Sequence, residues 1–395
     1  MPTIDRELDR IGGEAKLVIV HDDERVVDAY FLTLAPVRGF EKLVLGKNPI
    51  FVVEAVMRIC GICHAAHAIA AAEAFEDALG IMPPANGRIL REAIGLINRV
   101  QSHLFHLVLL LPDVLVENEV RTYVVETIKL LNLVNEIMMR IGGAPTHPPN
   151  VAIGGIAKPI PEASLREAIR RVDEVRKLFE DLREKIFSSD RVSPKVELLR
   201  KHSAFRDGGF IASHLFYGDK HNIDVEKVSV VRYEEFRKNV EMGSGSRTTS
   251  MVALYDGKIV EAGPRARLRT YKEFADGSLL GLQLARLNEI ELALHRIKEL
   301  LQQVELSAPV RTGTIVFRRG RGVGVYEAPR GTLIHFVELD DEGRVRSYRI
   351  VVPTMFNIPV IERCLVGLPI EIVDVVPRLY DPCIPCSTHF VRVRR

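Results

Sequence analysis

Two pairs of cysteines lie near opposite ends of the 395-residue chain. Cys60 and Cys63 form one Cys-x-x-Cys pair and Cys383 and Cys386 form the other, with 319 residues between Cys63 and Cys383. Thiols at this spacing can bind one metal, and sulfur ligands favour zinc, iron–sulfur, copper(I) or nickel sites. Because a structural zinc site usually draws its ligands from one small module, the wide separation favours a catalytic metal. A structural four-cysteine zinc site and a redox dithiol remain alternatives.

The residues around the cysteines favour thiolates, the form that binds metal. Arg58 and the amino terminus of the Ala-rich segment that follows the first pair both stabilise a thiolate. Gly61 lets the backbone turn between the first two thiols. His67 and His389 each follow a cysteine closely, although a histidine in such a position is more often a hydrogen-bonded core residue than a ligand. Cys364 has no partner in the sequence and is predicted to be a buried apolar residue.

Hydrophobic periodicity predicts the elements that carry these residues. Strands are expected at 15–21 and 25–34, and an Ala-rich helix at 65–79. Long amphipathic helices are expected at 88–111, 120–141, after Pro161 and at 278–304, and further strands at 314–317, 324–326, 332–338 and 344–352. The predicted fold class is α+β, predominantly helical, with a long-helix bundle core flanked by small sheet regions. The predicted regions are 1–50, 51–188, 189–274, 275–308 and 309–395.

Composition argues against a nucleic-acid or membrane partner. Lys and Arg total 54 and Asp and Glu total 52, so the net charge is only +2, and Trp is absent. A balanced chain has no global attraction to polyanions. The amino terminus lacks an apolar core typical of a secretory signal, and the apolar run at 107–111 is far shorter than the roughly 20 residues that span a bilayer. We therefore expect a cytoplasmic protein with no direct membrane insertion.

Both cysteine motifs together are similar to a known signature. Arg58-x-Cys60-Gly-x-Cys63-x-x-x-His67 and Asp381-Pro-Cys383-x-x-Cys386-x-x-His389 resemble the paired motifs of nickel–iron hydrogenase large subunits. Further matching stretches lie at 36–41, 111–113, 142–148, 255–257, 263–267, 327–331 and 352–354. The chain looks most similar to the archaeal subgroup that reduces a deazaflavin coenzyme. A relative of the quinone-facing subunit of respiratory complex I is a weaker alternative, because that subunit lacks the metal cysteines.

The resemblance implies two metal sites. Nickel would be held by Cys60, Cys63, Cys383 and Cys386, and an iron carrying carbon monoxide and cyanide would be bridged by Cys63 and Cys386. A magnesium or second iron ion would be bound by Glu41 and His389, with a backbone carbonyl near Ile350. The implied activity is the reversible, heterolytic cleavage of H2 into protons and electrons.

The resemblance also assigns residues around the metals. Arg330 would lie over the open metal position, paired with Asp113 and near Asp381, and the thiolate of Cys383 or Arg330 itself would transiently accept the proton. A planar guanidinium held by a carboxylate keeps its position better than a lysine would. The residues expected to surround the diatomic ligands and thiolates are Pro353, Thr354, Asp381 and His67, with Thr354 a possible donor to a cyanide.

One element departs from the family pattern. The family usually has Arg-x-Glu-Gly-His near the amino terminus, and its glutamate relays protons from a nickel-bound cysteine. Here residues 10–14 read Arg-Ile-Gly-Gly-Glu, so Gly12 occupies the position of the relay. Glu14 lies about 6.6 Å further along an extended strand, on the same face. We therefore expect an altered proton exit, with Glu14 as the candidate relay.

The remaining implied features concern processing and partners. Family precursors are cut after the last motif histidine, so a maturation endopeptidase would remove residues 390–395 after nickel chaperones load the site. The chain has no cysteines left for an electron-transfer cluster and no dinucleotide fingerprint. Electrons would therefore pass to an iron–sulfur small subunit and then to a flavin-containing subunit.

Overall fold

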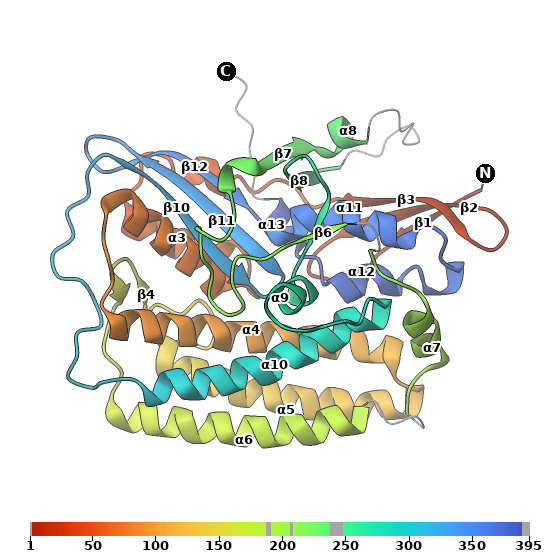
Figure 1. Cartoon of the computed structure of the whole chain (residues 1–395), viewed down its shortest axis with the longest axis horizontal. Coiled ribbons are helices and arrows are strands. Elements are labelled where there is room, and N and C mark those ends of the chain that lie inside the picture. Colours follow the sequence, from red (N-terminus) through yellow and green to blue (C-terminus); the bar gives the residue numbers. More distant parts are fainter. Residues whose placement is uncertain (1, 187–190, 206–207, 238–247, 389–395) are drawn as a thin grey trace.

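Four long helices form one side of the protein, along its longest axis (Figure 1). They are α4 (Ala85–Val114), α5 (Glu117–Gly142), α6 (Glu162–Ile186) and α10 (Leu279–Gln302). α4 packs against α5 and α10, and α6 packs against the same two helices, which closes a bundle. This computed structural model describes residues 2–186, 191–205, 208–237 and 248–388.

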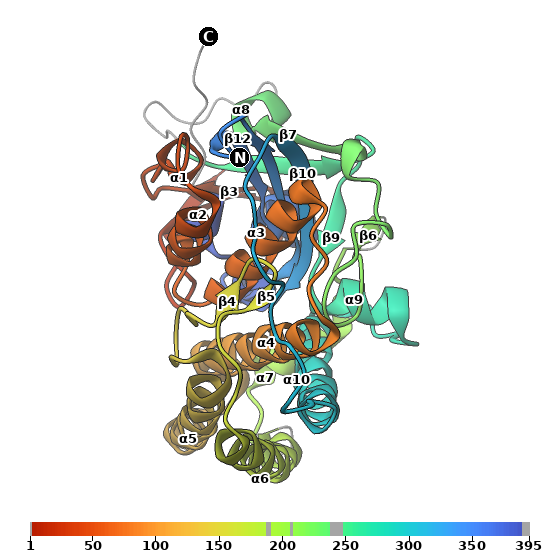
Figure 2. The same ribbon diagram turned by 90° about the vertical axis from the view of Figure 1, so that its left-hand side faces the viewer.

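The bundle helices differ in how much of their surface is apolar. On α6 the buried side chains recur every three or four residues, from Leu165 to Ile186, and charged residues fill the outer face. This stripe is the pattern of a helix at the edge of a bundle. α4 is the bundle helix that also contacts α3 (His64–Leu79) and β5 (Gly155–Ile156) (Figure 2), and it is apolar enough, by length and composition, to cross a membrane. Since 83% of its apolar window is buried inside the protein, its hydrophobicity is that of a core helix.

A three-stranded antiparallel sheet lies above the bundle and is covered by α3 (His64–Leu79). Its strands are β10 (Gly320–Ala328), β11 (Gly331–Leu339) and β12 (Val345–Val351). Glycines at every second position of β10 face the helix: a Cβ added at Gly324 would lie 2.0 Å from the Ala70 carbonyl oxygen. Because side chains alternate along a strand, this spacing clears one face and lets the Ala-rich helix approach the backbone closely.

A second antiparallel sheet is formed by the amino-terminal residues. It contains β1 (Thr3–Glu7), β2 (Ala15–His21) and β3 (Val26–Thr33), and α11 (Pro353–Leu365) packs against β3. The amino-terminal sheet and α11, which belongs to the last part of the sequence, therefore lie side by side (Figure 1). Shorter pairs in the described residues are β4 (Val151–Ala152) with β5 (Gly155–Ile156), β6 (Gly209–Ile211) with β9 (Val260–Ala262), and β7 (Val228–Arg232) with β8 (Met251–Tyr255).

Short helices connect these layers. They are α1 (Phe40–Leu43), α2 (Pro49–Val56), α7 (Pro194–Lys201), α8 (Tyr233–Phe236), α9 (Pro264–Tyr271), α12 (Val375–Tyr380) and α13 (Ile384–Ser387). Single 3-10 turns lie at Met57–Ile59, Val225–Lys227 and Ile370–Ile372.

The predicted fold class and the long-helix bundle are confirmed, and the predicted strands that form the two sheets are found. One predicted strand is wrong: the described residues 314–317 adopt no regular structure. Their apolar side chains Ile315 and Phe317 are partly buried against the core without a neighbouring strand. The composition was therefore a sign of burial and not of backbone pairing. β1 was not predicted, because its residues are mostly charged and exposed.

Candidate metal centre

Four buried cysteine thiols meet between the amino-terminal and carboxy-terminal parts of the chain. The sulfur of Cys60 lies 3.3 Å from that of Cys383, and the sulfur of Cys63 lies 3.1 Å from that of Cys386. Cys383 and Cys386 are 2.9 Å apart, and all four sulfurs lie within 4.8 Å of one another. The two motifs predicted to share one site are therefore brought together. The fifth cysteine, Cys364, is buried elsewhere, as predicted.

Backbone contacts hold the two cysteine loops in place. Cys63 caps the amino terminus of α3, and its amide donates to the sulfur of Cys60 over 3.4 Å. In the second loop, the Cys383 amide donates to the Thr354 hydroxyl over 3.0 Å. Gly12 forms a parallel bridge with Cys383, and its carbonyl accepts from the Ile384 amide over 2.8 Å. The amino-terminal segment thus lies directly against the second loop.

The thiols fit a soft divalent metal. Hydrogen bonds from neighbouring thiols, led by Cys383, hold the pKa of Cys60 well below its usual range. Burial, together with the hydrogen bond to Cys383, raises the pKa of Cys386 well above its usual range. The pKa values of Cys60 and Cys386 are thus shifted in opposite directions, so these two thiols resist ionising together. A divalent cation removes this repulsion, and thiolates select nickel, iron or zinc over harder ions.

Arg330 lies at the turn between β10 and β11 and contacts Asp381 beside the second loop. Its Nε donates to the Asp381 carbonyl over 2.6 Å and its Nη2 donates to the Asp381 carboxylate over 2.9 Å. Its Nη1 reaches the Ser102 hydroxyl at 3.4 Å. Burial lowers the pKa of Arg330, but Asp381 and the cysteine thiolates outweigh it and raise the pKa well above its ordinary value. The guanidinium is therefore a fixed positive charge at the thiol cluster.

The second oxygen of Asp381, Oδ2, is buried and has no hydrogen-bond partner among the described residues. Burial raises the pKa of this carboxyl, although Arg330 opposes the shift. Buried polar atoms are normally paired with protein, water or a bound group. The unpaired Asp381 oxygen is thus a further indication that this site binds a metal or another group.

The predicted ion pair between Arg330 and Asp113 is wrong. Asp113 instead accepts from Arg10 over 3.0 Å and from Arg378 over 3.1 Å. The physical reason is distance along α4: Ser102, the α4 residue that reaches Arg330, precedes Asp113 by eleven residues. Eleven residues of α-helix span about 16 Å, so Asp113 lies at the far end, where the amino-terminal segment meets α12.

His67 contacts the thiol cluster and leads to two residues that the sequence did not indicate. Its Nε2 lies 3.5 Å from the Cys386 sulfur, and its Nδ1 lies 3.1 Å from Nε2 of His335. Nδ1 of His335 lies 2.7 Å from the Tyr348 hydroxyl. Side chains alternate between the two faces of a sheet, and this alternation along two neighbouring strands was the only sequence signal that could have placed His335 and Tyr348 on one face. Pro353 begins α11 and is buried, one residue before Thr354.

The remaining predicted residues lie apart from the thiols or outside the described part. Glu41 is buried, and its carboxylate accepts from the Ile350 amide over 2.6 Å, so the two predicted neighbours do meet. His389 and the tail after it lie outside the described residues. Glu14 is exposed. Gly13, with φ at 111°, interrupts the extended geometry that the prediction of a shared face with Gly12 assumed.

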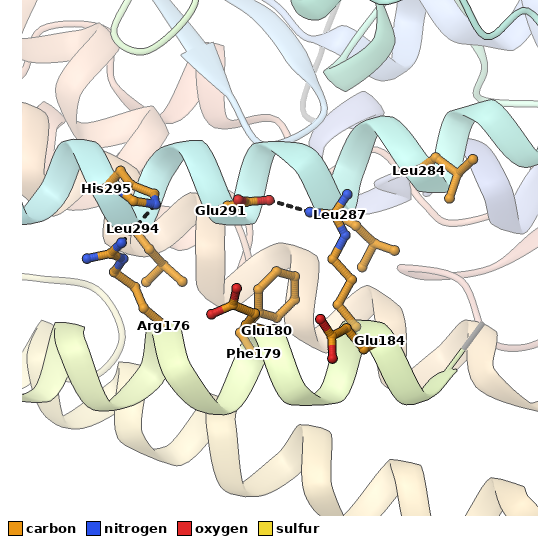
Figure 3. Close-up of a pocket in the computed structure, with 10 residues that line it drawn as sticks. Arg176, Phe179, Glu180, Glu184, Leu284, Leu287, Glu291, Leu294 and His295 are labelled. Atoms are coloured by element: carbon orange, nitrogen blue, oxygen red, sulfur yellow. Dashed lines mark hydrogen bonds and ion pairs between the residues drawn. The ribbon is translucent and has the colours of Figure 1, made fainter. Parts of the chain in front are cut away.

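A cavity of about 660 Å³ lies elsewhere, between α6 and α10 (Figure 3). Its floor is apolar, with Phe179 and Leu287, and its rim is charged. Arg183 pairs with Glu291 across the two helices. None of the four paired cysteines lines it, so it is separate from the metal centre.

Comparisons with known proteins agree with this geometry. The model of the nickel-dependent hydrogenase family matches residues 38–112 and 212–389, which include both cysteine motifs. The coenzyme F420 hydrogenase α subunit of Methanocaldococcus jannaschii is 34% identical, over 97% of this chain and 92% of the relative. That of Methanothermobacter thermautotrophicus is 33% identical, over 97% of this chain and 94% of the relative.

Solved structures agree as well. The Ni-Fe-Se hydrogenase of Desulfovibrio vulgaris Hildenborough is 25% identical and superimposes with a TM-score of 0.85, covering 98% of this chain and all of the other. These matches favour a hydrogenase over a structural zinc scaffold. The chain belongs to the nickel-dependent hydrogenase family, as a hydrogenase catalytic subunit.

Proposed function

We propose that this subunit cleaves H2 heterolytically and reversibly. The electrons released from H2 pass through partner subunits and reduce a deazaflavin coenzyme. The observation that carries the proposal is the cluster of four buried thiols, from both ends of the chain, beside Arg330 and Asp381. We assign nickel to all four cysteines, and iron with carbon monoxide and cyanide ligands to Cys63 and Cys386. When bound, this group supplies a redox-active acceptor for the hydride.

The chain's own residues hold charge and protons around that group. Asp381 anchors the Arg330 guanidinium by two contacts, so its positive charge stays in one place. Preorganised charge of this kind stabilises charge that develops during a reaction without further reorganisation. The Cys383 sulfur accepts the proton released from H2, and Pro353 and Thr354 line the pocket of the diatomic ligands. Thr354, whose oxygen accepts from the Cys383 amide, still has its own hydroxyl hydrogen to donate.

A second metal, magnesium or iron, is proposed at Glu41 and His389. The contact between Glu41 and Ile350 supports it, because it brings a buried carboxylate to the predicted backbone ligand. We also propose that a maturation endopeptidase removes residues 390–395 after nickel chaperones have loaded the thiols. A mass of the active protein that still includes these residues would contradict the cleavage.

The proton exit is proposed to differ from that of relatives with a glutamate relay. Gly12 contacts Cys383 but has no side chain. Glu14 is exposed, so it could act only through intervening water. If Glu14→Gln leaves the rate of hydrogen–deuterium exchange unchanged, Glu14 is not the relay.

The proposed electron acceptor and partners follow from the relatives. Three relatives at 30–34% identity are α subunits of coenzyme F420 hydrogenase, whereas two sulfhydrogenase α subunits of Pyrococcus furiosus are 28% identical. We therefore propose an iron–sulfur small subunit, a flavin-containing subunit and a cytoplasmic complex.

Infrared spectroscopy with metal analysis tests the catalytic assignment. The anaerobically purified complex should contain nickel and iron and show bands of metal-bound carbon monoxide and cyanide. Cys386→Ser should lose these bands, whereas Cys364→Ser, a buried cysteine outside the cluster, should keep them. Protein that contains only zinc would refute the proposal. Reduction of a viologen dye but not of the deazaflavin coenzyme by H2 would refute the proposed acceptor alone.

A further inference from the structure

Arg38 joins the two cysteine loops through their backbone carbonyls. Its Nη2 donates a hydrogen bond to the carbonyl of Ile59 and another, over 2.8 Å, to the carbonyl of Pro385. Ile59 directly precedes Cys60, and Pro385 directly precedes Cys386. One nitrogen of one side chain therefore bridges the two segments that supply the four thiols, although these segments lie near opposite ends of the sequence.

Both accepting carbonyls lie in short helical turns. Ile59 is the last residue of the 3-10 turn that begins at Met57, and Pro385 lies in α13, which ends at Ser387. The last carbonyls of a helix have no amide partner within it, so they need a donor from elsewhere. Each terminal nitrogen of a guanidinium carries two hydrogens, so Nη2 can donate to both carbonyls at once.

The segment that carries Arg38 is held in place on its other side. The main-chain amide of Arg38 donates to the Thr388 carbonyl over 2.8 Å, and the guanidinium lies over the Phe40 ring, 5.1 Å from its centroid. Such a cation–π contact is favourable and helps to orient the side chain. Phe40 begins α1, and the next residue, Glu41, accepts from the Ile350 amide on β12. The two loops are therefore connected to a segment that is itself fixed to the β10–β12 sheet.

The charge of Arg38 has no described partner of opposite sign. No carboxylate among the described residues lies within 4.0 Å of its guanidinium, and the residue is exposed. An ion pair or a place in the core therefore does not account for this arginine. Its described side-chain hydrogen bonds go to the two cysteine loops, and a substitution at this exposed position leaves the hydrophobic core intact.

We infer that Arg38 is a positioning residue that holds the two cysteine loops at a fixed separation, and thereby sets the geometry of the nickel site and slows the loss of nickel. The inference rests on the proposed function, in which both loops bind the same nickel. A metal held by two loops can leave only after one loop has moved away from the other, so a side chain that connects the loops opposes its release. The stretch 36–41 resembles the family pattern, and its arginine thus receives a role beside that of Glu41.

Arg38→Met in the complete, metal-loaded complex tests the inference. The variant removes both donors and keeps the apolar stem of the side chain, so the loops separate more readily. Nickel should pass to an excess of chelator about tenfold faster than in the wild type, the change expected for two solvent-accessible hydrogen bonds from a charged donor. The electron paramagnetic resonance signal of the nickel should also shift, because the ligand geometry is no longer fixed. Either a wild-type rate or an unshifted signal would overturn the inference.

Two further variants separate this role from a general loss of stability. Arg38→Lys keeps a cationic donor with three hydrogens, so it should lose nickel more slowly than Arg38→Met. Arg25→Met is the matched control, because Arg25 is also exposed and donates to the Gly367 carbonyl, which belongs to neither cysteine loop. It should lose nickel at the wild-type rate, and equal losses from Arg25→Met and Arg38→Met would overturn the inference.

Amide hydrogen exchange decides the matter if Arg38→Met fails to load nickel. In the full-length chain produced without nickel, the amides of residues 57–63 and 383–388 should both exchange faster in Arg38→Met than in the wild type. Faster exchange in only one of these segments, or in neither, would overturn the inference, since a connection between the loops must affect both. A wild-type complex that contains no nickel when nickel is supplied would instead contradict the proposed function.

Discussion

Asp113 offers the sharpest test of the structure, because sequence and structure assign it different partners. The sequence predicts that it pairs with Arg330 at the metals, whereas the structure pairs it with Arg10 and Arg378. The substitution Asp113→Asn keeps the size of the side chain and removes its charge. We expect the main loss to be in stability, because these pairs hold the amino-terminal segment against α12.

The size of this loss follows from burial. Asp113 is 3% exposed and Arg378 is 8% exposed, so their pair is shielded from water. Breaking a buried ion pair costs about 3–5 kcal/mol when the remaining charge has no partner. Arg378 keeps a second carboxylate, that of Asp9, and an asparagine oxygen still accepts one hydrogen bond. We therefore expect Asp113→Asn to lower the free energy of unfolding by about 2–3 kcal/mol.

Asp9→Asn is the matched control, since Asp9 pairs with the same arginine but is 70% exposed. An exposed pair contributes about 0–1 kcal/mol, so this variant should unfold close to the wild type. Two assays are needed. Thermal unfolding of the anaerobic complexes at one scan rate measures stability, and the rate at which the enzyme exchanges H2 with deuterium measures activity. Suppose that Asp113→Asn unfolds like Asp9→Asn but loses its exchange activity. Asp113 would then serve the metal centre, and the pairing described here would be refuted.

Three further predictions concern protons and packing. Gly12→Glu places a carboxylate beside the second cysteine loop, where its Cβ would lie 3.2 Å from the Pro382 carbonyl oxygen; we expect faster hydrogen–deuterium exchange, and an unchanged rate would show that proton exit does not limit the wild type. Burial raises the pKa of Glu362 from 4.5 to about 7. Because the folded state then holds the proton more tightly than the unfolded state, wild-type stability should fall as pH rises from 4.5 to 7, by up to about 3 kcal/mol. Melting curves of Glu362→Gln should lack this slope, and an equal slope would assign it to another group. Gly324→Ala should cost about 1–3 kcal/mol or more because α3 leaves no room for a methyl group, whereas Gly61→Ala, whose Cβ would meet no described atom within 4 Å, should melt near the wild type.

The elements and the ligand set could be predicted because both signals are local. The stripe on α6 and the alternation along β11 follow from which neighbours in the sequence are apolar. The Cys-x-x-Cys spacing likewise limits the metals that the sulfurs can bind. The local signal was misleading at residues 314–317, where the apolar side chains pack against the core but the backbone pairs with no strand.

By itself, the sequence identified the four paired thiols as candidate metal ligands, predicted the helical bundle and revealed the glycine at position 12. Only the tertiary structure decided which charges pair. Arg10, Arg330 and Arg378 all lie on segments that converge on the two carboxylates Asp113 and Asp381. The length of α4 between Ser102 and Asp113 separates Arg330, which pairs with Asp381, from Arg10 and Arg378, which pair with Asp113. A local sequence pattern does not reveal which of these charges meet. The contacts that link Cys386, His67, His335 and Tyr348 depend in the same way on strand register and on how α3 covers the sheet. These residues are far apart in the sequence and become neighbours only in the folded protein.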